Sequence, residues 1–256
     1  MEKIKPIIQA LSKHPNIVAI ALGGSRASGN QDEKSDYDVY VYYDQKIDVE
    51  FRKTVLSEYC CHMEMAVQYF EEEDDCILKD GIIIELIYRN IHNIKESIED
   101  LMHHATASLG YTTCFLDNII SSKVLYEENQ CYSKIKKSIT YPPTLRENII
   151  KKNMEMLHGV LASYDVQIMK AYERQDMISV NHRIAAYLAS YFDIIFAVNN
   201  VFHPGEKRLM ALAQSKCRFL PDDFEENIHR LLNLVDLEDT LKQLYLNLEN
   251  LIRQIA

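Results

Sequence analysis

The chain has 256 residues, of which 47% are hydrophobic and 26% are charged, and its formal net charge is −10. This composition is typical of a globular protein and excludes a disordered chain. The acidic charge also argues against a protein that grips long nucleic acid, because phosphate contacts require clustered Lys and Arg.

The sequence shows no sign of membrane insertion or secretion. None of its apolar runs reaches the ~18 to 20 residues that a membrane span needs, and the first ten residues, MEKIKPIIQA, lack the pattern of a signal peptide. The six cysteines show no CxxC spacing, so we expect neither a disulfide framework nor a zinc ribbon. These features predict a cytoplasmic protein without a membrane partner.

The first part of the chain combines helix and strand patterns. Residues 2–13 carry apolar side chains at helical spacing, and the continuous apolar run at 17–22 predicts a buried strand. A glycine-containing turn, GGSRASG, follows at 23–29. The Tyr- and Val-rich segment DYDVYVYY at 36–43 then predicts a second strand.

Further elements of the same kind are expected before residue 90. Residues 49–59 have a helical pattern, residues 62–70 are extended, and GIIIELIY at 81–88 is a strand that follows an Asp-Gly turn. The acidic run at 71–75 is interpreted as a solvated loop, because consecutive charges cannot all face a core.

Helical spacing dominates from residue 91 onward, beginning with a helix over 91–104. After a Pro-Pro break the pattern indicates a bundle with short connections, formed by the segments 144–172, 177–199, 206–215 and 222–254. We therefore predict an α+β protein with a mixed domain at 1–105, a connecting segment at 106–141 and a helical bundle at 142–256.

Carboxylates on the predicted strands are the candidate catalytic residues. Alternate residues of a strand share a face, so Asp36 and Asp38 project together, with Cα atoms roughly 6.5 to 7 Å apart. Glu85 is a lone acid in an apolar strand, which is costly unless it has a partner, such as Arg89, or a function as metal ligand or base. Glu64 is a second candidate for this third carboxylate.

Convergent carboxylates repel one another, so at least one of them should have a raised pKa, and a divalent cation would relieve the repulsion. Two Mg²⁺ ions about 3.5 to 4 Å apart can clamp the attacking and leaving oxygens of a phosphoryl transfer. The turn before these strands suits a phosphate, because backbone amides and a helix N-terminus can cradle its oxygens at Gly24 and Ser25. Arg26 could add a charged contact.

The segment GGSRASGNQDEKSDYDVYVY resembles the signature of the nucleotidyltransferase superfamily. That superfamily includes DNA polymerase beta, the kanamycin and lincosamide nucleotidyltransferases and the minimal nucleotidyltransferase antitoxins. The resemblance implies a polymerase-beta-like catalytic domain at 1–105. It also implies roles for individual residues: metal ligands at Asp36 and Asp38, triphosphate contacts at Gly24 and Ser25, and the third catalytic carboxylate at Glu85.

Residues 180–209 look like the helical domain of a group of uncharacterised bacterial nucleotidyltransferase-like proteins. The resemblance implies that the helical bundle helps to bind substrate, with the active site in a cleft between the domains. Within it, HPGEKR at 203–208 allows two interpretations. It is either a turn followed by a helix whose first turn carries Glu206, or a segment in which Lys207 or Arg208 binds triphosphate.

Together these features predict a Mg²⁺-dependent enzyme that transfers a nucleotide from ATP or another NTP to a hydroxyl. The expected nucleotide is AMP. A small acceptor resembling an aminoglycoside or lincosamide antibiotic is the leading interpretation, since an acidic protein suits a cationic ligand. A protein acceptor, as for the antitoxins, and a non-catalytic nucleotide-binding regulator are the alternatives. The acceptor, the preferred NTP and the oligomeric state are left open by the sequence.

Overall fold

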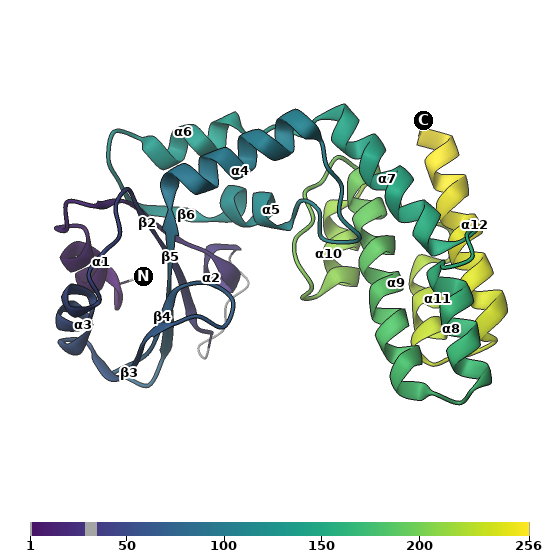
Figure 1. Cartoon of the computed structure of the whole chain (residues 1–256), viewed down its shortest axis with the longest axis horizontal. Coiled ribbons are helices and arrows are strands. Elements are labelled where there is room, and N and C mark those ends of the chain that lie inside the picture. Colours follow the sequence, from purple (N-terminus) through teal and green to yellow (C-terminus); the bar gives the residue numbers. More distant parts are fainter. Residues whose placement is uncertain (1, 29–34, 256) are drawn as a thin grey trace. The chain divides into compact units, whose positions relative to one another are not determined.

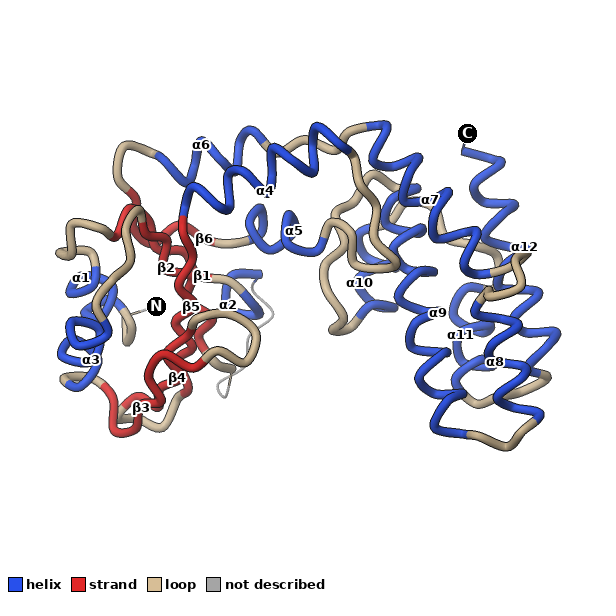
Figure 2. Tube along the Cα trace, in the orientation of Figure 1, coloured by secondary structure: helices blue, strands red, loops and turns tan. Residues whose placement is uncertain are grey.

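A computed structural model of the chain describes residues 2–28 and 35–255. They divide into two compact units (Figure 1), one of residues 1–100 and 118–140 and the other of residues 101–117 and 141–256. The first unit holds the sheet and the second is helical (Figure 2), which confirms the expected α+β class. None of the helices in the described part of the chain is both long and apolar enough to cross a membrane.

The first unit is built on a mixed sheet in the order β3-β4-β5-β2-β1-β6. Its strands are β1 (Ile17–Leu22), β2 (Tyr37–Tyr43), β3 (Cys60–Val67), β4 (Glu73–Leu78), β5 (Ile83–Asn90) and β6 (Lys123–Glu127). Strands β2 and β5 run parallel, and all other neighbours are antiparallel. This topology places the strand that carries Asp38 next to the strand that carries Glu85.

One face of this sheet forms the core of the unit. Its helices are α1 (Lys5–Leu11), α2 (Gly24–Ser28), α3 (Val49–Ser57) and α6 (Cys131–Ser138), and the boundaries between the units fall within α4 (Ile91–His104) and α5 (Cys114–Ser121). Apolar side chains of α1 and α3 pack against Val39, Leu86 and the other inward residues of the strands. Because strand residues alternate, Asp38 and Glu85 lie on the opposite face.

The second unit is a bundle of α7 (Pro143–Leu157), α8 (Tyr164–Glu173), α9 (Met177–Val198), α10 (Leu209–Lys216), α11 (Phe224–Leu232) and α12 (Leu237–Ile255). Helix α9 is central, since every residue of 189–198 is buried. The expected segment 144–172 is two helices, because the chain turns at 158–163 between α7 and α8.

The interpretation of residues 71–75 as a solvated loop is wrong, because β4 begins at Glu73. Alternation along the strand gives the acids different environments. Asp74 points into the core, where it pairs with the buried Arg52 at 3.5 Å and accepts the amide of Ala66 at 2.8 Å. Asp75 lies on the opposite, half-buried face. Consecutive acidic residues can therefore lie in a strand, because the inward-facing Asp74 has a buried partner in Arg52.

Candidate active site

The glycine turn and the Asp-x-Asp strand meet directly. The amide of Gly23 donates to the carbonyl oxygen of Asp38 at 2.8 Å, and Gly24 opens α2 with a φ of +61°. A Cβ added to Gly24 would lie 1.7 Å from Oδ2 of Asp38. The carboxylate therefore rests against the backbone of Gly24, with Ser25 as the next residue of α2. A side chain at Gly24 would displace the carboxylate.

A row of carboxylates extends from Asp38 across the sheet. Asp38 is paired in register with Glu85 on β5, Glu85 with Asp75 on β4, and Asp75 with Glu64 on β3. Directly paired residues share a face, so all four side chains lie on the face opposite to the core. Glu85 is the immediate neighbour of Asp38, whereas Glu64 lies two strands further away.

Burial raises the pKa of Glu85 above its ordinary value, and the nearby charges of Asp38 and then Asp36 raise it further. Asp36 lies just before β2 and is half-buried. The alternative partner Arg89 binds Glu71 instead, at 2.5 and 2.8 Å. Within the described residues, no donor reaches the Glu85 carboxylate. Glu85 is thus a partly buried acid with acidic neighbours and no compensating donor among the described residues.

The carboxylates on these strands suit a hard cation whose coordination is completed by other ligands. Among residues 2–28 and 35–255, no three His, Cys, Asp or Glu side chains converge closely enough to hold a metal by themselves. Mg²⁺ is usually bound by one or two carboxylates together with substrate phosphates and water. Asp38 and Glu85, paired on neighbouring strands, supply such oxygen ligands.

Arg26 ties the turn to the strand that carries the aspartates. Its Nε donates to the carbonyl oxygens of Ser35 and Asp36 at 2.8 and 3.0 Å, and its Nη2 also bonds Ser35. The guanidinium lies 4.0 Å from the centre of the Tyr37 ring. These contacts hold α2 against the start of β2, and a phosphate contact from Arg26 stays a prediction.

Lys207 and Arg208 are exposed residues of the second unit. Helix α10 begins only at Leu209, after Arg208 in a left-handed conformation with a φ of +57°. The interpretation that placed Glu206 in the first turn of a helix is therefore wrong. The role of Lys207 and Arg208 in triphosphate binding stays a prediction.

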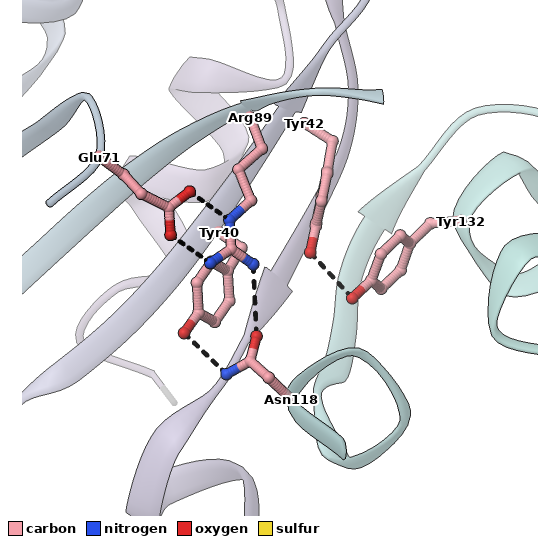
Figure 3. Close-up of polar contacts among 6 residues, drawn as sticks. All are labelled: Tyr40, Tyr42, Glu71, Arg89, Asn118 and Tyr132. Atoms are coloured by element: carbon pink, nitrogen blue, oxygen red, sulfur yellow. Dashed lines mark hydrogen bonds and ion pairs between the residues drawn. The ribbon is translucent and has the colours of Figure 1, made fainter. Parts of the chain in front are cut away.

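A polar network on the same face of the sheet was not predicted from the sequence (Figure 3). It joins Tyr40, Arg89 and Asn118. Asn118 comes from α5, far away in the sequence, so only the folded chain reveals the contact. Asp75 was also missed. The Asp-Gly turn at 80–81 was the available signal, because a hairpin turn requires a strand before it as well as after it.

A comparison with protein families matches the first part of the chain. Residues 5–93 match the model of the polymerase beta nucleotidyltransferase family. No curated protein matches the chain in sequence.

Three solved structures resemble the chain distantly. A spectinomycin adenyltransferase AAD(9) from Enterococcus faecialis, solved with ATP and spectinomycin, is 14% identical over 97% of this chain and 98% of its own, with a TM-score of 0.35. An aminoglycoside 6-adenyltransferase from Bacillus subtilis is 10% identical over 100% and 90%, with a TM-score of 0.31. A toxin-antitoxin structure with AMP-PNP is 16% identical over 71% and 99%, with a TM-score of 0.30. These likenesses are too distant to bear on the acceptor.

The matched residues contain the glycine turn, both aspartates and Glu85. The family match confirms the resemblance seen in the sequence. Residues 5–93, which lie in the first unit, match a nucleotidyltransferase domain of the polymerase beta family.

Proposed function

We propose that the chain transfers a nucleotide from a Mg²⁺-bound NTP to a hydroxyl of a small acceptor and releases pyrophosphate. The expected nucleotide is AMP. The observation that carries the proposal is the position of Asp38. Its carboxylate rests on the backbone of Gly24 and is paired in register with Glu85. A phosphate held by the turn would therefore lie beside two carboxylates.

The residues have separate roles in this proposal. The amides of the turn and the hydroxyl of Ser25 bind the β and γ phosphates. Asp36 and Asp38, with Glu85, would hold Mg²⁺, which supplies positive charge against the phosphate oxygens when bound. Glu85 also takes the proton of the acceptor hydroxyl as a general base. The acceptor oxygen bonds to the α phosphorus while the bond to the β phosphate breaks.

A small cationic acceptor, such as an aminoglycoside- or lincosamide-like compound, is favoured by charge. The net charge of the chain is −10, and the row from Glu64 to Asp38 adds local negative charge beside the proposed site. Carboxylates attract amino groups and raise their local concentration. Lys207 and Arg208 are proposed as additional triphosphate contacts.

The test is pyrophosphate release with Mg²⁺ and each of the four NTPs, measured across a panel of aminoglycosides, lincosamides and cell extract. Asp38→Asn should lower acceptor-dependent release by about 100-fold or more, because charge stabilisation at the reacting phosphate is lost. Asp80→Asn is the matched control, since Asp80 pairs with Lys3 outside the site. Release that persists in Asp38→Asn would contradict the mechanism.

The same assay separates the alternative acceptors. Labelled ATP incubated with cell extract should label a small molecule. A labelled protein would instead identify a protein acceptor. Tight binding of Mg-NTP without release or labelling would favour the regulatory alternative.

A further inference from the structure

The ring of Tyr40 packs against Gly23, the residue that begins the phosphate-binding turn. A Cβ added to Gly23 would lie 2.4 Å from Cε2 of Tyr40 and 3.2 Å from its Cδ2. The amide of Gly23 is bonded to the carbonyl oxygen of Asp38, two residues before Tyr40 on β2. The position of the turn is thus set by one short segment of β2, through a backbone bond and an aromatic ring.

Tyr40 is itself held in place by Arg89 and Asn118 (Figure 3). The guanidinium of Arg89 lies 4.3 Å from the centre of the Tyr40 ring. Nδ2 of Asn118 donates to the Tyr40 hydroxyl at 2.8 Å, and Nη1 of Arg89 donates to Oδ1 of Asn118 at 3.4 Å. The three side chains therefore form a closed triangle that fixes the plane of the ring.

Glu71 fixes the remaining side of Arg89. Its two carboxylate oxygens accept from Nε and Nη2 of Arg89 at 2.8 and 2.5 Å. Each of the three guanidinium nitrogens thus donates to a protein group, and the side chain is only 15% exposed. Arg89 is therefore engaged with the protein and suited to act through Tyr40.

The network lies directly beside the carboxylates. Asp38 is paired with Glu85 and Tyr42 with Arg89 in the same parallel ladder, with all four side chains on one face. A shift of the Tyr40 ring would move Gly23, and with it the carboxylate that rests on Gly24.

We propose that Arg89 is a positioning residue for nucleotide binding, which holds the turn at Gly23 through the ring of Tyr40. This role rests on the proposed function, because it assigns the turn to the phosphates of the NTP. Arg89 itself does not contact the nucleotide.

Arg52 offers a matched control on the other face of the same sheet. Its guanidinium lies 4.1 Å from the centre of the Tyr88 ring and pairs with Glu72 at 3.1 Å and Asp74 at 3.5 Å. It thus combines a stacked tyrosine with carboxylates of the neighbouring segment, but it faces the core. Replacing Arg52 and Asp74 together, as R52Q/D74N, avoids leaving one buried charge without its partner.

The experiment measures the Kd for each Mg-NTP by calorimetry and the KM and kcat of the wild type, R89Q and R52Q/D74N, below the melting temperature of each. R89Q should raise the Kd and KM for nucleotide about tenfold, because a small misplacement weakens every phosphate contact, while kcat changes little. The control should melt at a lower temperature but bind nucleotide like the wild type.

The outcomes separate the two proposals. A wild type that binds none of the four Mg-NTPs would overturn the proposed function and the positioning role with it. A wild type that binds, with R89Q binding equally well or R52Q/D74N equally weakened, would overturn the positioning role alone.

A double-mutant cycle tests the contact without nucleotide. G23A should destabilise the wild type because its Cβ meets the Tyr40 ring, and it should be nearly neutral in a Y40L background, where that ring is absent. Equal destabilisation in both backgrounds would show that the ring does not hold the turn.

Discussion

At the scale of single residues, Gly24 and Asp38 form the contact on which the site depends. Gly24 adopts a φ of +61°, which L side chains rarely occupy, and it lacks the Cβ that would fill the space of the Asp38 carboxylate. Conformation and close approach therefore both require glycine here. The Asp38 carboxylate can occupy its position because Gly24 has no side chain.

Gly24→Ala should lower pyrophosphate release by about 100-fold or more, because its Cβ would displace the carboxylate that rests there. Gly81→Ala is the control. Gly81 has a φ of +87°, but a Cβ there would meet nothing within 4 Å. Both variants should lose about 1 kcal/mol of stability from backbone strain. Comparing activity and urea denaturation of the two variants separates strain from displacement, and equal activities would refute the contact.

The aspartates could be predicted from the sequence, whereas the choice of third carboxylate needed the structure. Their spacing of two residues predicts a common direction on an extended segment, and the structure places Asp38 in β2 and Asp36 just before it. Glu64 and Glu85 are both lone acids in extended segments. Only the strand order distinguishes them, because it places β5 beside β2 and β3 two strands beyond.

At the scale of elements, the segment expected to connect two domains is divided between the units. Residues 118–140 belong to the first unit, where Tyr132 of α6 donates to or accepts from Ser122 and packs on Tyr42 at 4.4 Å between ring centroids. Residues 101–117 belong to the second, where Asn153 of α7 accepts the amide of Gly110 at 3.0 Å. These side-chain contacts hold the two parts of the segment in different units.

Helix α9 binds residues 101–117 through the buried carboxylate of Asp193. Oδ2 of Asp193 accepts from the Thr112 hydroxyl at 2.7 Å, and the side chain is 1% exposed. Burial raises the pKa of Asp193 from 3.8 to about 6, although the bonds from Thr112 oppose the shift. The folded state therefore binds a proton more tightly than the unfolded chain does. Stability should fall as the pH rises through the window from about 4 to 6.

Asp193→Asn removes the charge and keeps an oxygen that can accept from Thr112. Relative to the wild type it should gain roughly 1 to 3 kcal/mol between pH 4 and pH 7, and the two proteins should be similar below pH 4. Urea denaturation across this range measures the difference. The exposed Asp222→Asn is the control and should show no such trend. A constant difference between Asp193→Asn and the wild type would contradict the assigned cause.

At the scale of the whole molecule, the helical unit includes residues 101–117 as well as 141–256. A fragment of 142–256 lacks Thr112, which donates to Asp193, and two backbone partners of Asn153, Ser108 and Gly110. It also lacks Thr113, whose hydroxyl accepts the amide of the buried His203 at 2.8 Å. Buried polar groups that lose their partners are destabilising.

We therefore expect the fragment 142–256 to melt roughly 10 °C or more below the fragment 101–256, since each kcal/mol shifts the melting temperature by several degrees in chains of this size. Thermal unfolding followed by circular dichroism measures the difference. Equal melting temperatures would show that the helical bundle begins after the connecting segment.

The strands around the glycine turn and the helical second half could be predicted from the sequence, because they depend on spacing between residues close in the chain. Three features appear only in the folded chain: the pairing of Glu85 with Asp38, the burial of Asp74 in β4 and the contacts of Arg89 and Asn118 with Tyr40. Those features depend on strand order and on side chains far apart in sequence. Neither is encoded in any local period, so they appear only when the chain is folded.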